Sequence, residues 1–176
     1  MNVVAYTAGV PASKGYSYRT SGCEEKVAHE FGKVMDDQSK GIAVKKENGS
    51  FSVAIYRLPT LQIDFCNRNI AIFLTLTGLT ETDARALLRF YLDNVDTNWE
   101  TATAPLTRAF EWNEQDEQGW TVDFDELKRG IDDITKKYTE DSVPNKPFSD
   151  RWEKENTAAT RGDLSEKLKA TSNNLP

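Results

Sequence analysis

The run from Ile70 to Leu76 constrains the fold more than any other feature of this sequence. It reads Ile-Ala-Ile-Phe-Leu-Thr-Leu and is the most apolar stretch of the chain. A strand that is apolar on both faces belongs in the middle of a sheet, with a layer of structure covering each side. The run is also far shorter than the roughly 20 residues that a membrane-spanning helix needs. The sequence therefore predicts a soluble domain built around this strand.

Further strands are predicted around this run. Asn48-Gly49 is a strong signal for a two-residue hairpin turn, and the residues after it alternate between apolar and polar up to Ile55. Pro59 is expected to end that strand, because proline cannot donate a ladder hydrogen bond. The other expected strands are short segments at 3–6, 16–18 and 61–65.

Three helices are expected from apolar residues at helical spacing. The first covers residues 22–38 and begins with a capping-box pattern from Ser21 to Glu24. The second covers 80–95, and the third follows Asp123. Gly130 within the third helix weakens it by about 1 kcal/mol relative to alanine. Residues 98–122 give no regular pattern.

Together these elements predict an α+β fold: a mainly antiparallel sheet with an early inserted helix and two or more C-terminal helices packed on it. Residues 1–141 are expected to form a single domain. Residues 142–176 hold three of the six prolines and few apolar residues, so they read as a loosely ordered tail with a short helix at 163–169.

The charge of the chain is concentrated in its middle. Residues 1–79 carry a net charge of +2, residues 80–141 carry −9, and residues 142–176 carry +1. An acidic field repels a phosphate backbone, so we expect neither direct nucleic-acid binding nor binding to an anionic membrane. The segment 93–141 is instead a candidate surface for a protein partner, especially a basic one. Solvated acidic helix faces that maintain solubility are the alternative.

No pattern indicates a catalytic, metal or cofactor site. The two cysteines, Cys23 and Cys66, lie far apart in the sequence, which is typical of free thiols in a reducing compartment. His29 is the only histidine and falls off the apolar stripe of its helix, so no zinc ligand pair is present. Met1 to Val10 lacks the features of a secretion signal. We therefore expect a cytoplasmic protein with no cofactor and no metal, leaning away from an enzyme.

The segment before the central strand is the first candidate site. Asp64, Asn67, Arg68 and Asn69 place polar and charged side chains at the mouth of a buried strand, where binding residues are often found. They predict a ligand site in which Arg68 contacts a phosphorylated or nucleotide-like molecule. A salt bridge from Asp64 to Arg68 within a turn made by the asparagines is the alternative.

The second candidate site is a partner surface in residues 98–122. Aromatic side chains anchor many protein interfaces, and nearby acids raise the encounter rate with a basic partner. Trp112 or Trp120 would be the anchor. The steering acids would be Glu111, Glu114, Asp116 and Glu117. Burial of the tryptophans in the core is the alternative, since indole is usually mostly buried.

Two stretches carry a resemblance to a known group of proteins. The residues Asp64-Phe65-Cys66-Asn67-Arg68-Asn69-Ile70-Ala71-Ile72, and then Leu76-Thr77-Gly78-Leu79-Thr80-Glu81, resemble the N-terminal modules of GTPase-associated and effector-associated proteins of bacterial conflict systems. The resemblance covers residues 3–95. It implies a recruiting or adapting module without enzymatic residues. The sequence departs from that group in showing no effector domain after the module.

The sequence as a whole predicts a soluble bacterial protein–protein interaction or regulatory module of non-enzymatic type. Two alternatives stay open. One is a small enzyme or ligand-binding protein that uses the 64–69 loop, which requires a pocket containing Asp64 and Arg68. The other is an acidic decoy or immunity protein that caps a basic, nucleic-acid-handling partner, which requires a continuous acidic face.

Overall fold

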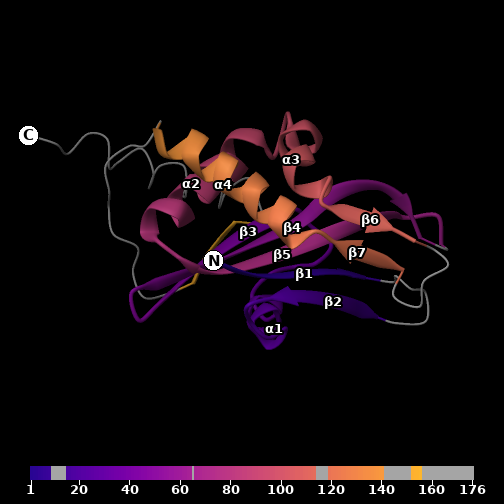
Figure 1. Ribbon diagram of the computed structural model, residues 1–176, viewed down its shortest axis with the longest axis horizontal. Helices are drawn as coiled ribbons and strands as arrows, with labels where there is room; N and C mark the ends of the chain where they lie inside the picture. The colour runs from indigo at the N-terminus through magenta and orange to yellow at the C-terminus, as the bar shows by residue number, and fades with distance from the viewer. Residues whose placement is uncertain (9–14, 65, 114–118, 141–151, 156–176) are drawn as a thin grey trace, which may run out of the picture.

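A six-stranded antiparallel sheet with helices on both faces forms the body of the molecule in the computed structural model (Figure 1). The structure describes residues 1–8, 15–64, 66–113, 119–140 and 152–155. The strands of the sheet are β1 (Asn2–Ala8), β2 (Tyr16–Ser21), β3 (Gly41–Glu47), β4 (Ser50–Ile63), β5 (Asn69–Leu79) and β8 (Trp152–Glu155), in the order β2-β1-β5-β4-β3-β8. The helices are α1 (Lys26–Gly32), α2 (Glu81–Asn94), α3 (Trp99–Thr107) and α4 (Phe124–Glu140). This arrangement confirms the predicted α+β class.

Strand β5 is central, as its composition predicts. It pairs with β1 on one side and with β4 on the other. Its leucines Leu74 and Leu76 are buried against the layer formed by α2, α3 and α4, whereas Phe73 is buried on the opposite face. Both faces of β5 are therefore covered.

The predicted hairpin joins β3 to β4. Glu47 lies opposite Ser50, and the two residues between them both have positive φ, 51° at Asn48 and 77° at Gly49. Asparagine and glycine tolerate this conformation better than other residues, and its twist matches that of the flanking strands. The Asn-Gly pair thus fixes the register of β3 and β4.

Strand β4 is longer than predicted, because Pro59 does not end it. The pairing of β4 with β5 shifts register between Ile55 and Leu58 and again between Pro59 and Ile63. Proline is tolerated beside such bulges, where the ladder is already interrupted. The first bulge contains Arg57, a non-glycine residue with a φ of 62°.

Two of the three predicted helices have the expected boundaries and caps. Thr80 and Asp83 form a complete capping box at the start of α2, and the Asp123 carboxylate accepts hydrogen bonds from the backbone of Asp125 and Glu126 at the start of α4. Helix α1 is shorter than the predicted 22–38. Its predicted cap, Ser21, is instead the last residue of β2.

The segment 98–122, which gave no sequence pattern, folds into α3 and a separate hairpin. The hairpin consists of β6 (Phe110–Trp112) and β7 (Trp120–Val122). Helix α3 contains Pro105 and packs closely on α4: a Cβ added to Gly130 would lie 2.5 Å from the Pro105 carbonyl oxygen. Gly130 therefore permits a close contact that a larger residue would obstruct.

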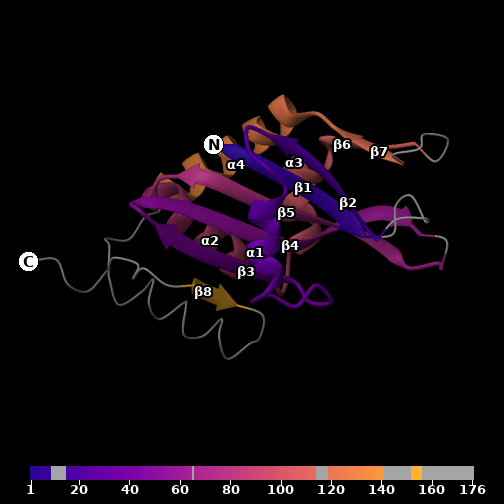
Figure 2. The same cartoon turned by 90° about the horizontal axis from the view of Figure 1, so that it is seen from below.

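The two faces of the sheet are covered unequally. Helices α2, α3 and α4 lie over one face, whereas among the described elements α1 is the only helix on the other (Figures 1 and 2). None of the described helices is long and apolar enough to cross a membrane. A helix as short as α1 cannot cover a whole sheet face, and this second face carries the candidate site.

The predicted tail contains a strand. Residues 152–155 form β8, which pairs antiparallel with β3 from Ile42 to Lys45. The rest of the predicted tail, including the helix expected at 163–169, lies outside the described residues.

Candidate functional site

A row of aromatic side chains crosses three strands on the face under α1. Tyr6 of β1 lies directly opposite Tyr18 of β2 and opposite Phe73 of β5. Directly opposite residues in antiparallel strands place their side chains in contact. The ring of Tyr6 is stacked between the other two, with centroid distances of 4.9 Å to Tyr18 and 5.0 Å to Phe73.

Two more tyrosines extend this row. Tyr16 lies two residues before Tyr18 in β2 and therefore on the same face of the sheet; its ring meets Tyr6 edge-on at 5.6 Å. Tyr56 comes from β4, at the bulge opposite Phe73, and its ring meets Phe73 edge-on at 5.0 Å. The sheet thus brings together four tyrosines from three strands.

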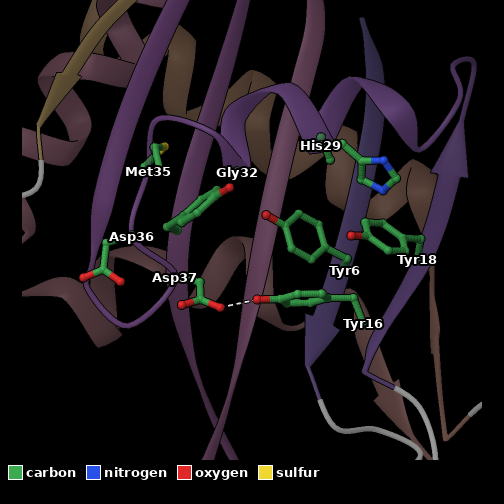
Figure 3. A pocket seen from close by; sticks show the side chains of 10 residues that line it. Tyr6, Tyr16, Tyr18, His29, Gly32, Met35, Asp36 and Asp37 are labelled. Carbon is green, nitrogen blue, oxygen red and sulfur yellow. Dashed lines mark hydrogen bonds between the residues drawn. The ribbon is translucent and has the colours of Figure 1, made fainter.

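Helix α1 and the segment after it form the other wall. Together the two walls enclose a cavity of about 360 Å³, which we call the tyrosine pocket (Figure 3). It is lined by Tyr6, Tyr16, Tyr18, Tyr56, Ala28, His29, Gly32, Met35, Asp36 and Asp37. In Figure 3 the hydroxyl groups of Tyr6, Tyr16 and Tyr18 point toward the side of the pocket where Asp37 lies. The pocket therefore has apolar walls and a group of polar atoms at one side.

Asp37 is held in place by side chains from the sheet and from its own loop. The Tyr16 hydroxyl donates to the Asp37 carboxylate, and Gln38 donates to the same carboxylate at 2.8 Å. The Arg57 guanidinium donates to the backbone carbonyl of Asp37 at 3.1 Å. The hydrogen bonds from Tyr16 and Gln38 are the main cause of the lowered pKa of the Asp37 carboxyl group, so it carries a full negative charge near neutral pH.

The tyrosines of the pocket are neutral. Burial is the main cause that raises the pKa of Tyr6, Tyr16, Tyr18 and Tyr56. The neighbouring Tyr56 raises the pKa of Tyr6 further. Because all four phenols keep their protons at neutral pH, they serve as hydrogen-bonding groups and not as bases.

We expect these tyrosines to resist ionisation in alkaline solution. An unfolded tyrosine ionises near its ordinary pKa of about 10, whereas the folded protein keeps these protons to higher pH. Folding stability is thus fully present below about pH 10 and falls above it, as the unfolded state releases protons that the native state retains. Phenolate absorbance measured during a pH titration, beside the same titration in concentrated urea, tests this. If all six tyrosines of the native protein titrated together with those of the unfolded chain, the burial of this cluster would be refuted.

The described residues of the predicted 64–69 site form a closed turn. The Asp64 carboxylate accepts hydrogen bonds from the backbone N–H groups of Cys66 and Arg68 and from the Arg68 guanidinium at 2.8–2.9 Å. Asn67 adopts a φ of 60° and donates its backbone N–H to the Asp64 carbonyl. The hydrogen bonds from the Arg68 backbone are the main reason why the pKa of Asp64 is lowered. This geometry matches the alternative of an internal salt bridge in a turn.

The same turn lies beside the tyrosine pocket. A second, smaller cavity of about 120 Å³ is lined by Asp64, Arg68 and Asn69 from the turn, together with Arg57 and Asp37. Asp37 lines both cavities. Three of the four predicted ligand residues therefore border a cavity next to the main one, whereas Asn67 is not among its lining residues.

The second predicted site is only partly described. Trp120, predicted as an anchor, is fully buried and serves as a core residue: its indole N–H donates to Ser17 at 3.2 Å, and the Arg19 guanidinium lies 4.5 Å from the ring centroid. Trp112 is half-buried and stacks on Trp120, and Glu111 is exposed. Glu114, Asp116 and Glu117 lie outside the described residues.

The exposed surface of α4 carries charges of both signs. Asp125, Asp132 and Asp133 are exposed there, and so are Arg129, Lys136 and Lys137. Glu126 is paired with Arg108 at 2.7 Å and with Arg129 at 2.9 Å. The described surface of α4 therefore carries acidic and basic side chains side by side, and the decoy alternative stays a prediction.

Other reactive groups in the described residues do not form a centre. Cys23 and Cys66 are free thiols, as predicted, and partial burial raises the pKa of Cys23, which keeps its sulfur protonated. Within the described ranges, no group of three or more His, Cys, Asp and Glu side chains is placed to hold a metal ion. Comparison of the chain with protein-family models, curated proteins and solved structures found no match.

The sequence analysis missed most of the tyrosine pocket. The alternation of Tyr16 and Tyr18 was visible, but the partners of these tyrosines depend on strand register. One available signal was that β1 and β4 each carry a tyrosine among aliphatic residues, since tyrosine joins an apolar ring to a polar tip that needs a hydrogen-bond partner or water.

Proposed function

We propose that this chain is a non-enzymatic interaction module that recognises a protein partner through the tyrosine pocket. The observation that carries this proposal is the cavity itself. It measures about 360 Å³, is lined by four tyrosines and two aspartates, and lies on the sheet face that α1 covers only in part. Concave sites with apolar walls and a few fixed polar groups are the usual form of binding sites.

The chemistry of the pocket favours binding over catalysis. Its phenols are protonated, and its Asp37 carboxylate is already hydrogen-bonded by Tyr16 and Gln38. Catalytic bases and nucleophiles need pKa values tuned toward the working pH, whereas here the pKa values of the tyrosines and of Asp37 are shifted away from neutrality. The resemblance of residues 3–95 to recruiting modules of bacterial conflict systems agrees with such a role.

Closing the pocket tests this function. Gly32 lines the pocket, and a Cβ built on it has no atom within 4 Å, so Gly32→Phe is designed to place a ring in the pocket. A displayed library of random peptides is panned on the native protein, and the selected peptides are measured on the variant. We expect affinity to fall at least tenfold.

The matched control is Ala104→Phe, which adds the same ring at an exposed position of α3, on the other face of the sheet. Affinity should be unchanged in this variant. Selected peptides that bind Gly32→Phe as tightly as the native protein would show that recognition takes place elsewhere, and would remove the basis of the proposal.

A further inference from the structure

We infer that the tyrosine pocket takes the primary ammonium group of a lysine side chain from its partner. This inference rests on the proposed function and specifies the chemistry that the pocket selects. The argument comes from the charges that line the cavity, from the direction of its hydrogen bonds and from its shape.

Among the described residues that line the pocket, two carboxylates are the side chains that carry a full charge at neutral pH by their ordinary chemistry. Asp36 and Asp37 line it together with the tyrosines and His29, and none of its described lining residues is a lysine or an arginine. Arg57 donates to the Asp37 backbone carbonyl and lines the smaller cavity. A carboxylate or phosphate entering the tyrosine pocket would be repelled, and a cation would be attracted.

The hydrogen bonds inside the pocket leave acceptors facing the cavity. Tyr16 uses its proton on the Asp37 carboxylate. The oxygen atoms of these groups keep lone pairs that need donors. A primary ammonium group brings three N–H donors, whereas a trimethylated ammonium group brings none. Hydrogen bonds to charged groups are also stronger than neutral ones.

The remaining walls suit an alkyl stem. Ala28 and Met35 are buried apolar residues beside the pocket, and Gly32 at its border adds no side chain. A lysine carries its ammonium group on a flexible four-carbon chain, which lies favourably along apolar surface while the charged end reaches polar groups. A basic protein partner, expected from the acidic sequence, supplies such side chains.

The probe for this inference is n-butylammonium, which reproduces the end of a lysine side chain. Its binding to the full chain is followed by amide and tyrosine NMR shifts, beside n-butanol, butyrate and n-butyltrimethylammonium. We expect n-butylammonium to shift the resonances of the pocket tyrosines and to bind at least about tenfold more tightly than the other three. Equal binding of the alcohol, or stronger binding of the trimethylated amine, overturns the inference.

Two substitutions locate the interaction. Asp37→Asn keeps an oxygen that accepts from Tyr16 but removes the charge, and should weaken n-butylammonium binding about tenfold. Asp93→Asn removes the same charge from α2, on the other face of the sheet, and should have little effect. If the two variants bind equally well, the pocket does not select a cation.

The peptides from the panning experiment separate this inference from the proposed function. In peptides that depend on the open pocket, replacing the lysines by norleucine should abolish binding, and a lysine peptide should bind more tightly than n-butylammonium alone. Pocket-dependent peptides without any lysine would refute the lysine inference and leave the proposed function intact. Peptides insensitive to Gly32→Phe would refute the function itself.

Discussion

Replacing Trp120 by alanine is expected to lower the free energy of unfolding by about 3–5 kcal/mol, the usual range for removing a fully buried tryptophan. The side chain is 0 % exposed and stacks on Phe110 and Trp112. Its loss also leaves Ser17 without the indole donor and removes the contact with the Arg19 guanidinium. Because natural domains are stable by only about 5–15 kcal/mol, this is a large fraction of the total.

Trp112→Ala is the control for this experiment, because that ring is only half-buried. It should cost clearly less than Trp120→Ala. Unfolding in guanidinium, followed by circular dichroism in place of tryptophan fluorescence, measures both. A loss below about 1 kcal/mol for Trp120→Ala would be too small for a core tryptophan and would return Trp120 to the role of an interface anchor.

Gly130→Ala should destabilise the protein, although alanine is the better helix former. Alanine would gain about 1 kcal/mol from helix propensity in α4. Its Cβ, however, would lie 2.5 Å from the Pro105 carbonyl oxygen and 3.1 Å from the carbonyl carbon. These are backbone atoms of α3, which cannot rotate away, and overpacking of this kind costs about 1–3 kcal/mol. We expect a net loss of up to about 2 kcal/mol.

Gly32→Ala is the opposite case and serves as the comparison. A Cβ at this position in α1 meets open space. The helix-propensity gain of up to about 1 kcal/mol should therefore raise the free energy of unfolding. Thermal and denaturant unfolding of both variants shows whether each substitution raises or lowers the free energy of unfolding. Stabilisation by Gly130→Ala would mean that α3 and α4 separate easily at their crossing point.

The elements that could be predicted from sequence are those fixed by neighbouring residues. Asn48-Gly49 carries its own turn geometry, and Thr80 with Asp83 forms a cap that needs nothing from the rest of the chain. The boundary of α1 and the length of β4 depend on contacts between distant segments. Ser21 would cap a helix in isolation, but pairing with Val3 places it in β2. Pro59 would end a strand unless bulges already interrupt the ladder.

The same distinction explains what the sequence revealed of the candidate site. The Asp64–Arg68 pair is local, and both its interpretations could be stated in advance. The tyrosine pocket needs the register of β1 against both β2 and β5, which no short pattern encodes. Trp99 also supports the pocket, from a position more than 40 residues further along the chain. Its indole N–H donates to the Arg57 carbonyl at 3.0 Å and so supports the bulge next to Tyr56.

Strand β8 has a consequence for the behaviour of the protein at high concentration. Without it, β3 would end the sheet, and its Gly-Ile-Ala-Val sequence is the kind of apolar strand that recruits further strands from other molecules. The pairing of residues 152–155 with β3 places a different sequence at the border of the sheet, Trp-Glu-Lys-Glu, in which three of four residues are charged. Charged border strands oppose the growth of a sheet from one molecule to the next. We therefore expect β8 to lower the tendency of the domain to aggregate through β3.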